Sequence, residues 1–388
     1  MGYKIIHLGL GRFHRAHQAV YFQKLNANIH VTAFSMRSPE VRDQLRTVQN
    51  RYPVLEIAKD KTEVRWIDCI RESYFVGEDE HQLWALFASP EVHWVTLTVT
   101  EKAYVTAGDT IRILVEGLKH RQAINLPLTV LSCDNLRENG SKLKELVLNA
   151  ASADLKIWIE KNVSFPNTMV DRIVPALDPE KVLELQKQNN INNPELLATE
   201  TFSQWVIEDN FKTERPALEK VGVQFVKDVR PFEEMKLRLL NASHSLIAYA
   251  GLIKGYSYVH EAIRDAEILA KVKGLYSEVI PLLEVPVSFN VEKYVEQLIN
   301  RFDNPLLPHQ LRQIAMDGSQ KLPQRILPSK KIALEKNILT PNLDAALDAW
   351  AKHCFTQDIN DPLKEKILEL KKSNSDFKIF KAALLNLI

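Results

Sequence analysis

The sequence is poor in cysteine and in motifs that hold metal ions. Its 388 residues include three cysteines, Cys69, Cys133 and Cys354, and no two of them have C-x-x-C spacing. Three cysteines so far apart, without that spacing, exclude a disulfide framework and a thiolate zinc site. The sequence also has no H-E-x-x-H motif. We therefore expect reduced, mostly buried thiols and no metal in the site.

Net charge and long apolar runs are also missing. Fifty basic and 49 acidic residues leave a formal charge of +1, so no long-range field favours nucleic acid or an anionic membrane. No uncharged apolar stretch reaches the roughly 18 residues that span a bilayer. The short N-terminal apolar run is broken by His7 and is not followed by a cleavage site of small residues. We expect a cytoplasmic protein without nucleic-acid or membrane partners.

A chain of this length fits two domains, and the pattern of apolar residues divides it near residue 230. Before that point, short β-branched runs alternate with amphipathic stretches such as 110–124 and 141–161. The runs predict buried parallel strands at residues 3–8, 29–36, 93–100, 128–133 and 221–229. Two further runs, 54–59 and 63–69, predict an antiparallel hairpin inserted after the second strand. The alternation predicts an α/β fold with a doubly wound, Rossmann-type sheet in a nucleotide-binding domain, residues 1–229.

The rest of the chain, residues 230–388, predicts an all-α substrate domain. Apolar residues recur there with helical spacing, and Pro, Asn and Asp separate the helical runs. The expected helices are 234–255, 258–273, 290–302, 341–355 and 361–372.

The first expected strand runs directly into GLGRFHRAH, the start of a dinucleotide-binding fingerprint. Gly9 allows a sharp turn, and Gly11 lets the backbone approach a pyrophosphate. The third position is His14 instead of Gly or Ala, so the motif is incomplete. Because it lies between a strand and a helix, we interpret it as a nucleotide-binding turn, with Arg12 and Phe13 as further cofactor contacts.

The second strand ends in SMRSPE, where a dinucleotide enzyme often carries an acidic residue for the ribose hydroxyls. Here Arg37 stands at that turn and the first acid is Glu40. An arginine can accept a 2′-phosphate or stack on adenine. NAD is the expected cofactor, and this segment leaves NADP open.

Two more expected strands end in polar clusters, TEKAY and SCDN. Ligands of open α/β sheets bind beyond the carboxyl ends of the strands. Glu101, Lys102, Asp134 and Asn135 are therefore candidates for the cofactor region. Turn formation or capping is the alternative for Asp134 and Asn135.

One stretch of the helical domain, EEMKLRLLNASHS, places polar groups in an otherwise apolar helix. At about 100° per residue, Asn241 lies about 140°, His244 about 80° and Glu233 about 60° around from Lys236. A metal-free alcohol dehydrogenase needs a base for the hydroxyl proton and donors for the developing oxyanion. Lys236 fits the base, because burial favours a neutral lysine. Asn241 and His244 fit the donors, and Glu233 could pass the proton to solvent. A solvated lysine with a packed histidine is the alternative.

At this point the sequence resembles the polyol-specific long-chain dehydrogenases, the family of mannitol 2-dehydrogenase and D-mannonate oxidoreductase. The resemblance covers most of the chain. It rests on these strings, in the family's order: GLGRFHRAHQAVY, TLTVTEKAY, LSCDNLRENG, FPNTMVDRIVPA, FSQWVIEDNF, EEMKLRLLNASHSLIAYAG and AMDGSQKLPQR.

The resemblance implies zinc-independent hydride transfer at C2 of an open-chain sugar. It makes Lys236 the base, lets Asn135 and Asn241 polarise the carbonyl, and associates Glu233 with proton release. Lys321 matches a substrate-binding lysine, and Arg312 and His309, nearby in sequence, are weaker candidates.

The resemblance favours a small sugar or polyol substrate and a monomer, with a dimer also possible. TEKAY, LRENG, DRIVP and AMDGSQKLPQR are closer to the mannonate branch than to the mannitol branch. Mannitol oxidation, a sugar-phosphate substrate and a cofactor-bound sensor without turnover are the competing interpretations.

Overall fold

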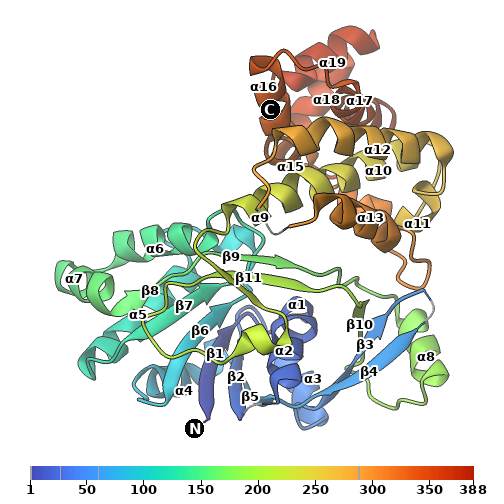
Figure 1. Cartoon of the computed structure of the whole chain (residues 1–388). Coiled ribbons are helices and arrows are strands. Elements are labelled where there is room, and N and C mark those ends of the chain that lie inside the picture. The colour runs from blue at the N-terminus through green and yellow to red at the C-terminus, as the bar shows by residue number, and fades with distance from the viewer. Residues whose placement is uncertain (1, 27, 60, 287–288) are drawn as a thin grey trace. The chain divides into compact units, whose positions relative to one another are not determined.

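The computed structural model describes residues 2–26, 28–59, 61–286 and 289–388. It separates into two compact units, the first ending at Arg230 and the second beginning at Pro231. All the labelled strands belong to the first unit, and the second is built from helices (Figure 1).

A six-stranded parallel sheet forms the centre of the first unit. Its strands are β1 Tyr3–Leu8, β2 Ile29–Ser35, β5 Ile70–Phe75, β6 Val92–Leu97, β7 Leu128–Ser132 and β8 Val163–Ser164. They run in the order β5-β2-β1-β6-β7-β8, which is the Rossmann order with its switch point between β1 and β6. The Rossmann-type, doubly wound sheet predicted from the sequence is confirmed.

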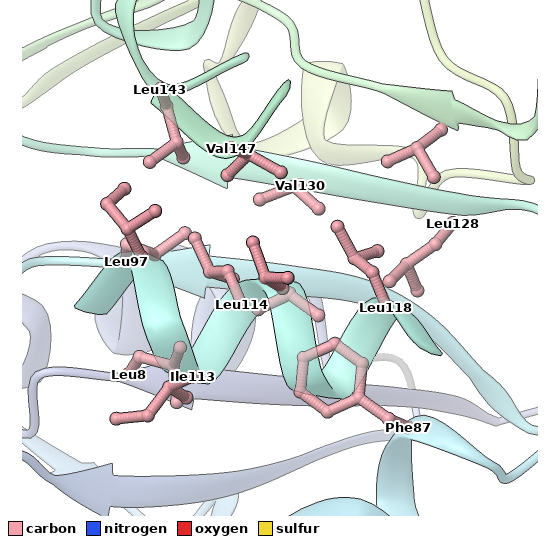
Figure 2. Close-up of a cluster of buried hydrophobic side chains, with 14 of the residues drawn as sticks. Leu8, Phe87, Leu97, Ile113, Leu114, Leu118, Leu128, Val130, Leu143 and Val147 are labelled. Atoms are coloured by element: carbon pink, nitrogen blue, oxygen red, sulfur yellow. The ribbon is translucent and has the colours of Figure 1, made fainter. Parts of the chain in front are cut away.

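Both faces of this sheet are buried, because successive residues of a strand point to opposite sides. In β1, Ile6 and Leu8 join one apolar cluster, and Ile5 joins the other. Figure 2 shows the first cluster, where Leu114 and Leu118 lie among side chains of neighbouring elements. Each fully buried leucine or isoleucine contributes roughly 1.5–3 kcal/mol. The two clusters fix the sheet on which the loops beyond β1, β6 and β7 stand.

The helices of the first unit follow the predicted alternation with one break. They are α1 Arg12–Ala16, α2 Gln18–Leu25, α3 Glu40–Thr47, α4 Val76–Phe87, α5 Asp109–Ala123, α6 Asn139–Ala150, α7 Ala153–Asn162 and α8 Pro179–Gln188. The single helix expected at 141–161 is two helices, because Ala151 and Ser152 adopt extended backbone angles.

Two small sheets complete the first unit. The predicted hairpin is confirmed as antiparallel β3 Tyr52–Ile57 and β4 Thr62–Ile67, and β10 Leu197–Glu200 adds to β3 in parallel. The other sheet joins β12 Gln224–Val226, β11 Gln204–Glu208 and β9 Thr168–Asp171.

One strand prediction is wrong in its placement. The run 221–229 was expected in the main parallel sheet, yet its strand is β12, three half-exposed or exposed residues that pair with β11. Gly222, at φ +97, turns the chain just before it. The outermost position of the main sheet is instead taken by β8, whose two residues are too few to produce an apolar pattern. β5, β9, β10 and β11 were not predicted.

The second unit is helical, as predicted. Its elements are α9 Arg230–Met235, a π-helical segment Lys236–Asn241, α10 Ala242–Ile253, α11 Val259–Ala262, α12 Ala266–Val279, α13 Val291–Phe302, α14 Leu311–Ala315, α15 Gly318–Arg325, α16 Leu327–Glu335, α17 Pro341–Thr356, α18 Lys364–Ser373 and α19 Phe377–Leu385. The helix expected at 258–273 divides where Asp265 accepts hydrogen bonds from two backbone amides and caps α12. α14, α15, α16 and α19 were not predicted.

The three cysteines are free and buried, as expected. Among the described residues, no helix has both the length and the apolar character to cross a bilayer.

Candidate active site

The turn after β1 requires glycine at Gly9. Its φ is +97°, and a Cβ there would lie 2.2 Å from the carbonyl oxygen of Thr98. The amides of Gly9 and Leu10 both donate to Phe34 O, at 2.9 and 3.1 Å, which holds the turn against the end of β2. A Cβ on Gly11 would meet nothing closer than 3.7 Å. The backbone at Gly11 is therefore open to the close approach that a pyrophosphate needs.

Histidines, and not a third glycine, support this turn from inside the protein. His14 is fully buried, and its ring stacks on that of His7 with centroids 3.3 Å apart. His7 Nε2 lies 3.1 Å from Gly9 O and its Nδ1 lies 2.8 Å from Thr96 Oγ1. Burial lowers the pKa of His7 to about 3, so the pair is neutral. The departure from the fingerprint at His14 is therefore a packing feature beneath the loop.

The predicted cofactor contacts on α1 differ in exposure. Arg12 is exposed, whereas the Phe13 ring is half-buried and stacks on His17 at 4.9 Å. The neighbouring Arg15 is buried, and its Nη1 lies 2.6 Å from Glu195 Oε2. Arg15 is thus engaged in an internal ion pair, which leaves Arg12 as the arginine of this loop that faces solvent.

Strained backbone marks the end of β6. Thr100 has φ 74° and ψ 156°, a region that residues other than glycine rarely occupy. Asp134 stabilises it, because its carboxylate accepts from Val99 N at 3.2 Å, from Thr100 N at 2.8 Å and from Tyr104 Oη at 2.8 Å. Burial raises the pKa of Asp134, and these hydrogen bonds oppose that change. The Asp134 carboxylate joins the ends of β6 and β7, and its contact with a cofactor remains a prediction.

The other candidates at the carboxyl edge are exposed. Glu101 and Lys102 lie on a short 3₁₀ turn after Thr100, and Asn135 Nδ2 lies 3.5 Å from Glu101 Oε1. Arg37 Nη2 lies 3.4 Å from Thr100 Oγ1. The structure therefore gathers the side chains that follow β2, β6 and β7 at one edge of the sheet, beside the switch point.

The resemblance string FPNTMVDRIVPA has a structural role in the first unit. Thr168 N donates to Asn139 Oδ1 at 2.9 Å, and Ser141 N donates to Asn167 Oδ1 at 2.8 Å. Arg172 is buried, pairs with Glu56 and donates to Ala16 O at 2.6 Å. These contacts tie the string to the first turn of α6, to α1 and to β3, and sequence reasoning missed them.

In the second unit, the predicted polar helix contains a π turn. α9 passes into the π-helical segment Lys236–Asn241 and then into α10. A π turn joins residues i and i+5 through the backbone, so residues five apart stand nearly above one another. Lys236 and Asn241 are five apart, whereas an ordinary α-helix would separate them by about 140°.

Polar side chains of this helix are buried. The exposed fractions are 5% for Glu233 and 8% for both Asn241 and His244, and Lys236 is half-buried. Within the described part of the chain, Asn241 Nδ2 and His244 Nε2 have no hydrogen-bond partner. Leaving a buried polar atom unpaired costs about 1–3 kcal/mol. Both nitrogens are therefore available to a polar ligand.

The surroundings of His244 include two of the predicted substrate residues. Its ring lies 5.5 Å from the His309 ring and 4.6 Å from the Phe302 ring. Burial lowers the pKa of His309 to about 4 and that of His244 well below its usual value, and the charge of Lys321 adds to both shifts. Both imidazoles are thus neutral near pH 7.

Arg312 has a different setting. It is exposed on α14 and lines an open groove of about 960 Å³ together with Tyr256, Asp358 and Asn360. Its part in substrate binding remains a prediction.

Arg325 and Ser243 contact the polar helix in ways that the sequence did not indicate. Arg325 Nη1 donates to Asn241 O at 3.3 Å and to Ser245 Oγ at 3.1 Å. Ser243, fully buried, donates to Leu239 O and Leu240 O. The sequence indicated Arg325 only as a cation available to a substrate carboxylate, and nothing in the pattern singled out Ser243.

Comparison with known proteins matches both units to one family. Residues 3–220 match the mannitol dehydrogenase Rossmann domain, and residues 228–384 match the mannitol dehydrogenase C-terminal domain. The chain belongs to the mannitol dehydrogenase family, and the resemblance found in the sequence is confirmed.

Particular relatives support this membership. D-mannonate oxidoreductase of Escherichia coli strain K12 is 37% identical over 96% of this chain and 85% of its own length. A mannitol 2-dehydrogenase of Emericella nidulans is 33% identical over 94% of this chain and 82% of its own length. The structure of Pseudomonas fluorescens mannitol 2-dehydrogenase in ternary complex with NAD and D-mannitol is 32% identical, with a TM-score of 0.88 over 99% of this chain and 86% of that one.

Proposed function

We propose that this protein is a metal-independent oxidoreductase that uses NAD to interconvert a ketose or ketouronate and the corresponding polyol or aldonate at C2. D-mannonate and fructuronate are the proposed pair. Family membership supports the reaction type, and the relatives of this chain include both a D-mannonate oxidoreductase and a mannitol 2-dehydrogenase.

The residues of the first unit fit a dinucleotide. The Gly9 turn has no room for a side chain, and the backbone at Gly11 is open. Arg12, Arg37, Glu101 and Lys102 would supply exposed contacts around it. NAD is proposed because the structural relative was solved with NAD, and Arg37 keeps NADP as the alternative. When bound, NAD would accept or supply the hydride.

The helix of the second unit supplies the proton chemistry. In alcohol oxidation, Lys236 takes the hydroxyl proton as general base, and Glu233 relays it to solvent. Asn241 donates to the oxygen as it becomes a carbonyl, a role that the family resemblance also gives to Asn135, and His244 holds the substrate. In carbonyl reduction, Lys236 returns the proton to the same oxygen.

One observation carries this proposal. Lys236 and Asn241 are the first and last residues of the π-helical segment, and Asn241 Nδ2 and His244 Nε2 are buried without hydrogen-bond partners in the described part of the chain. A buried amide and imidazole that share a face with a lysine are the groups that an alcohol oxygen needs. A cofactor-binding sensor would have no use for an amine placed in this way.

The charge near His244 favours an anionic substrate. Arg325, Arg301 and Lys321 are close enough that their charges lower the pKa of His244, after burial as the main cause. A carboxylate at the far end of the sugar would be attracted to such a region. Mannitol 2-dehydrogenase activity is the second candidate, since hydroxyl groups can accept from the same donors.

A substrate panel tests the proposal. The purified protein is assayed by nicotinamide absorbance with fructuronate, tagaturonate, fructose and fructose 6-phosphate, each with NADH and NADPH. We expect the highest kcat/KM with fructuronate and NADH. A preference for fructose would shift the assignment to the mannitol branch. Absence of turnover with every pair would contradict the proposed function and favour the sensor.

A further inference from the structure

The π turn between Lys236 and Asn241 receives side-chain hydrogen bonds at its C-terminal end. At such a point the backbone register changes from i→i−5 to i→i−4, which leaves carbonyl groups open to other donors. Ala242 N, at this end of the segment, reaches Leu237 O, five residues earlier, and also Leu239 O, three residues earlier. π turns inside α-helices are rare and frequently lie at functional sites.

Ser243 is the first of these donors. Its Oγ lies 2.7 Å from Leu239 O and 3.0 Å from Leu240 O, and the residue is fully buried. Tyr276 of α12 donates from its hydroxyl to Ser243 Oγ at 3.1 Å. Burial raises the pKa of Tyr276, so its phenol stays a donor. Because Tyr276 supplies a proton to Ser243, the proton of Ser243 is free for the carbonyls.

Arg325 of α15 is the second donor. Its Nη1 reaches Asn241 O, the carbonyl of the last π residue, and also Ser245 Oγ one turn further on. Ser245 is 1% exposed. Arg325 therefore spans the junction between the π segment and α10.

We propose that Ser243, supported by Tyr276, and Arg325 are positioning residues that hold the π turn and thereby place Lys236 beside Asn241. This rests on the proposed function, in which Lys236 is the base. If the segment returned to α-helical spacing, Lys236 would rotate by about 100° relative to Asn241 and His244. The proton acceptor would then leave the face that carries the amide and the imidazole.

A purely structural role is the competing explanation, because buried serines often bond to the carbonyl four residues earlier. Matched controls separate the two. Ser277, which is exposed, makes the same kind of bond, to Lys273 O at 3.1 Å, within the regular helix α12. Tyr249 also has a buried hydroxyl that donates to a carbonyl, Ala315 O at 3.3 Å.

The experiment compares Ser243→Ala with Ser277→Ala, and Tyr276→Phe with Tyr249→Phe, in the full chain. We expect Ser243→Ala to lower kcat by up to about 100-fold, because misplacing a catalytic group by 1 Å can cost that much. Tyr276→Phe should lower kcat less, and the KM for NAD should stay constant in both. Ser243→Thr should restore kcat, since its hydroxyl can reach the same carbonyls. Arg325→Lys should retain more activity than Arg325→Met.

Thermal unfolding of every variant shows whether a lost rate is only lost stability. If Ser243→Ala and Tyr276→Phe lose no more kcat than their controls, the positioning role is overturned while the base assignment stands. If Lys236→Ala keeps turnover, the assigned base is wrong and both proposals fall. Should Ser243→Ala not fold, Tyr276→Phe still decides, because it removes a single oxygen atom.

Discussion

The candidate residues of the two units differ in exposure. Arg12, Arg37, Glu101 and Lys102 of the first unit are exposed. In the second unit, Glu233, Asn241 and His244 are each at least nine-tenths buried. Cofactor recognition on the first unit is therefore assigned to backbone geometry and to solvated side chains, each of which contributes little alone. Proton transfer on the second unit is assigned to the half-buried Lys236, together with the buried Glu233, Asn241 and His244.

The two units also differ in the kind of hydrogen bond that holds the candidate site in place. The turn at Gly9 is held by backbone hydrogen bonds from Gly9 N and Leu10 N to Phe34 O. The π turn depends on side chains from α12 and α15 that are distant in sequence. Substitutions in the first unit should therefore act on affinity, and those in the second on rate.

The largest expected effect compares two lysines. Lys236→Ala should lower kcat for alcohol oxidation by about 10²–10⁴-fold, the usual contribution of a general base. Lys102→Ala, on an exposed turn, should change kcat little and raise the KM for NAD modestly. Steady-state kinetics with titration of NADH fluorescence measures both. Equal losses of kcat in the two variants would erase the contrast between the units.

The next effect compares two glycines of one loop. Gly9→Ala should destabilise the first unit by about 1–2 kcal/mol from its positive φ alone, and the 2.2 Å contact with Thr98 O adds to this. Gly11→Ala should fold normally, because its Cβ meets no atom closer than 3.7 Å, and should weaken NAD binding. Calorimetric unfolding measures the loss of stability expected in Gly9→Ala. Titration with NAD measures the loss of affinity expected in Gly11→Ala. If Gly11→Ala binds NAD with full affinity, the pyrophosphate does not approach the backbone at Gly11.

The smallest expected effect is the pH dependence of stability caused by a buried histidine of the helical unit. Burial lowers the pKa of His353 to about 4, below the ordinary value of about 6.5. The unfolded chain therefore binds more protons between these pH values, and stability falls as pH drops from about 6.5 to 4. At pH 5, His353→Gln should therefore reduce the acid-induced loss of unfolding free energy by about 1–2 kcal/mol. Denaturant unfolding at pH 5 and pH 7.5 tests it, with exposed His81→Gln as control. The same pH slope in both variants would contradict the expectation.

Much of the fold could be predicted because its signals are local. The strands β1, β2, β6 and β7 and the hairpin β3–β4 were all expected from short apolar runs. The two-residue β8 and the half-exposed β12 were not predicted correctly, because pairing with distant strands, and not an apolar pattern, defines them.

The sequence predicted which residues form the candidate site, but not the side chains that hydrogen-bond to the helix carrying them. The roles assigned to Lys236, Asn241 and His244 remain predictions, while their surroundings are now described. Arg325 and Tyr276 reach the helix from 84 and 33 residues away in the sequence, the latter through Ser243. No local pattern indicates such contacts.

The sequence by itself determined the Rossmann-type sheet, the helical second unit and the glycine turn after β1. Residue periodicity and the conformational freedom of glycine are local properties, so they can be seen in the chain. Only the tertiary structure decided that Asp134 stabilises the strained Thr100, that Arg15 is held in an ion pair, and that the helix at Lys236 adopts π spacing. Each of these depends on partners far away in the sequence, which folding alone brings together.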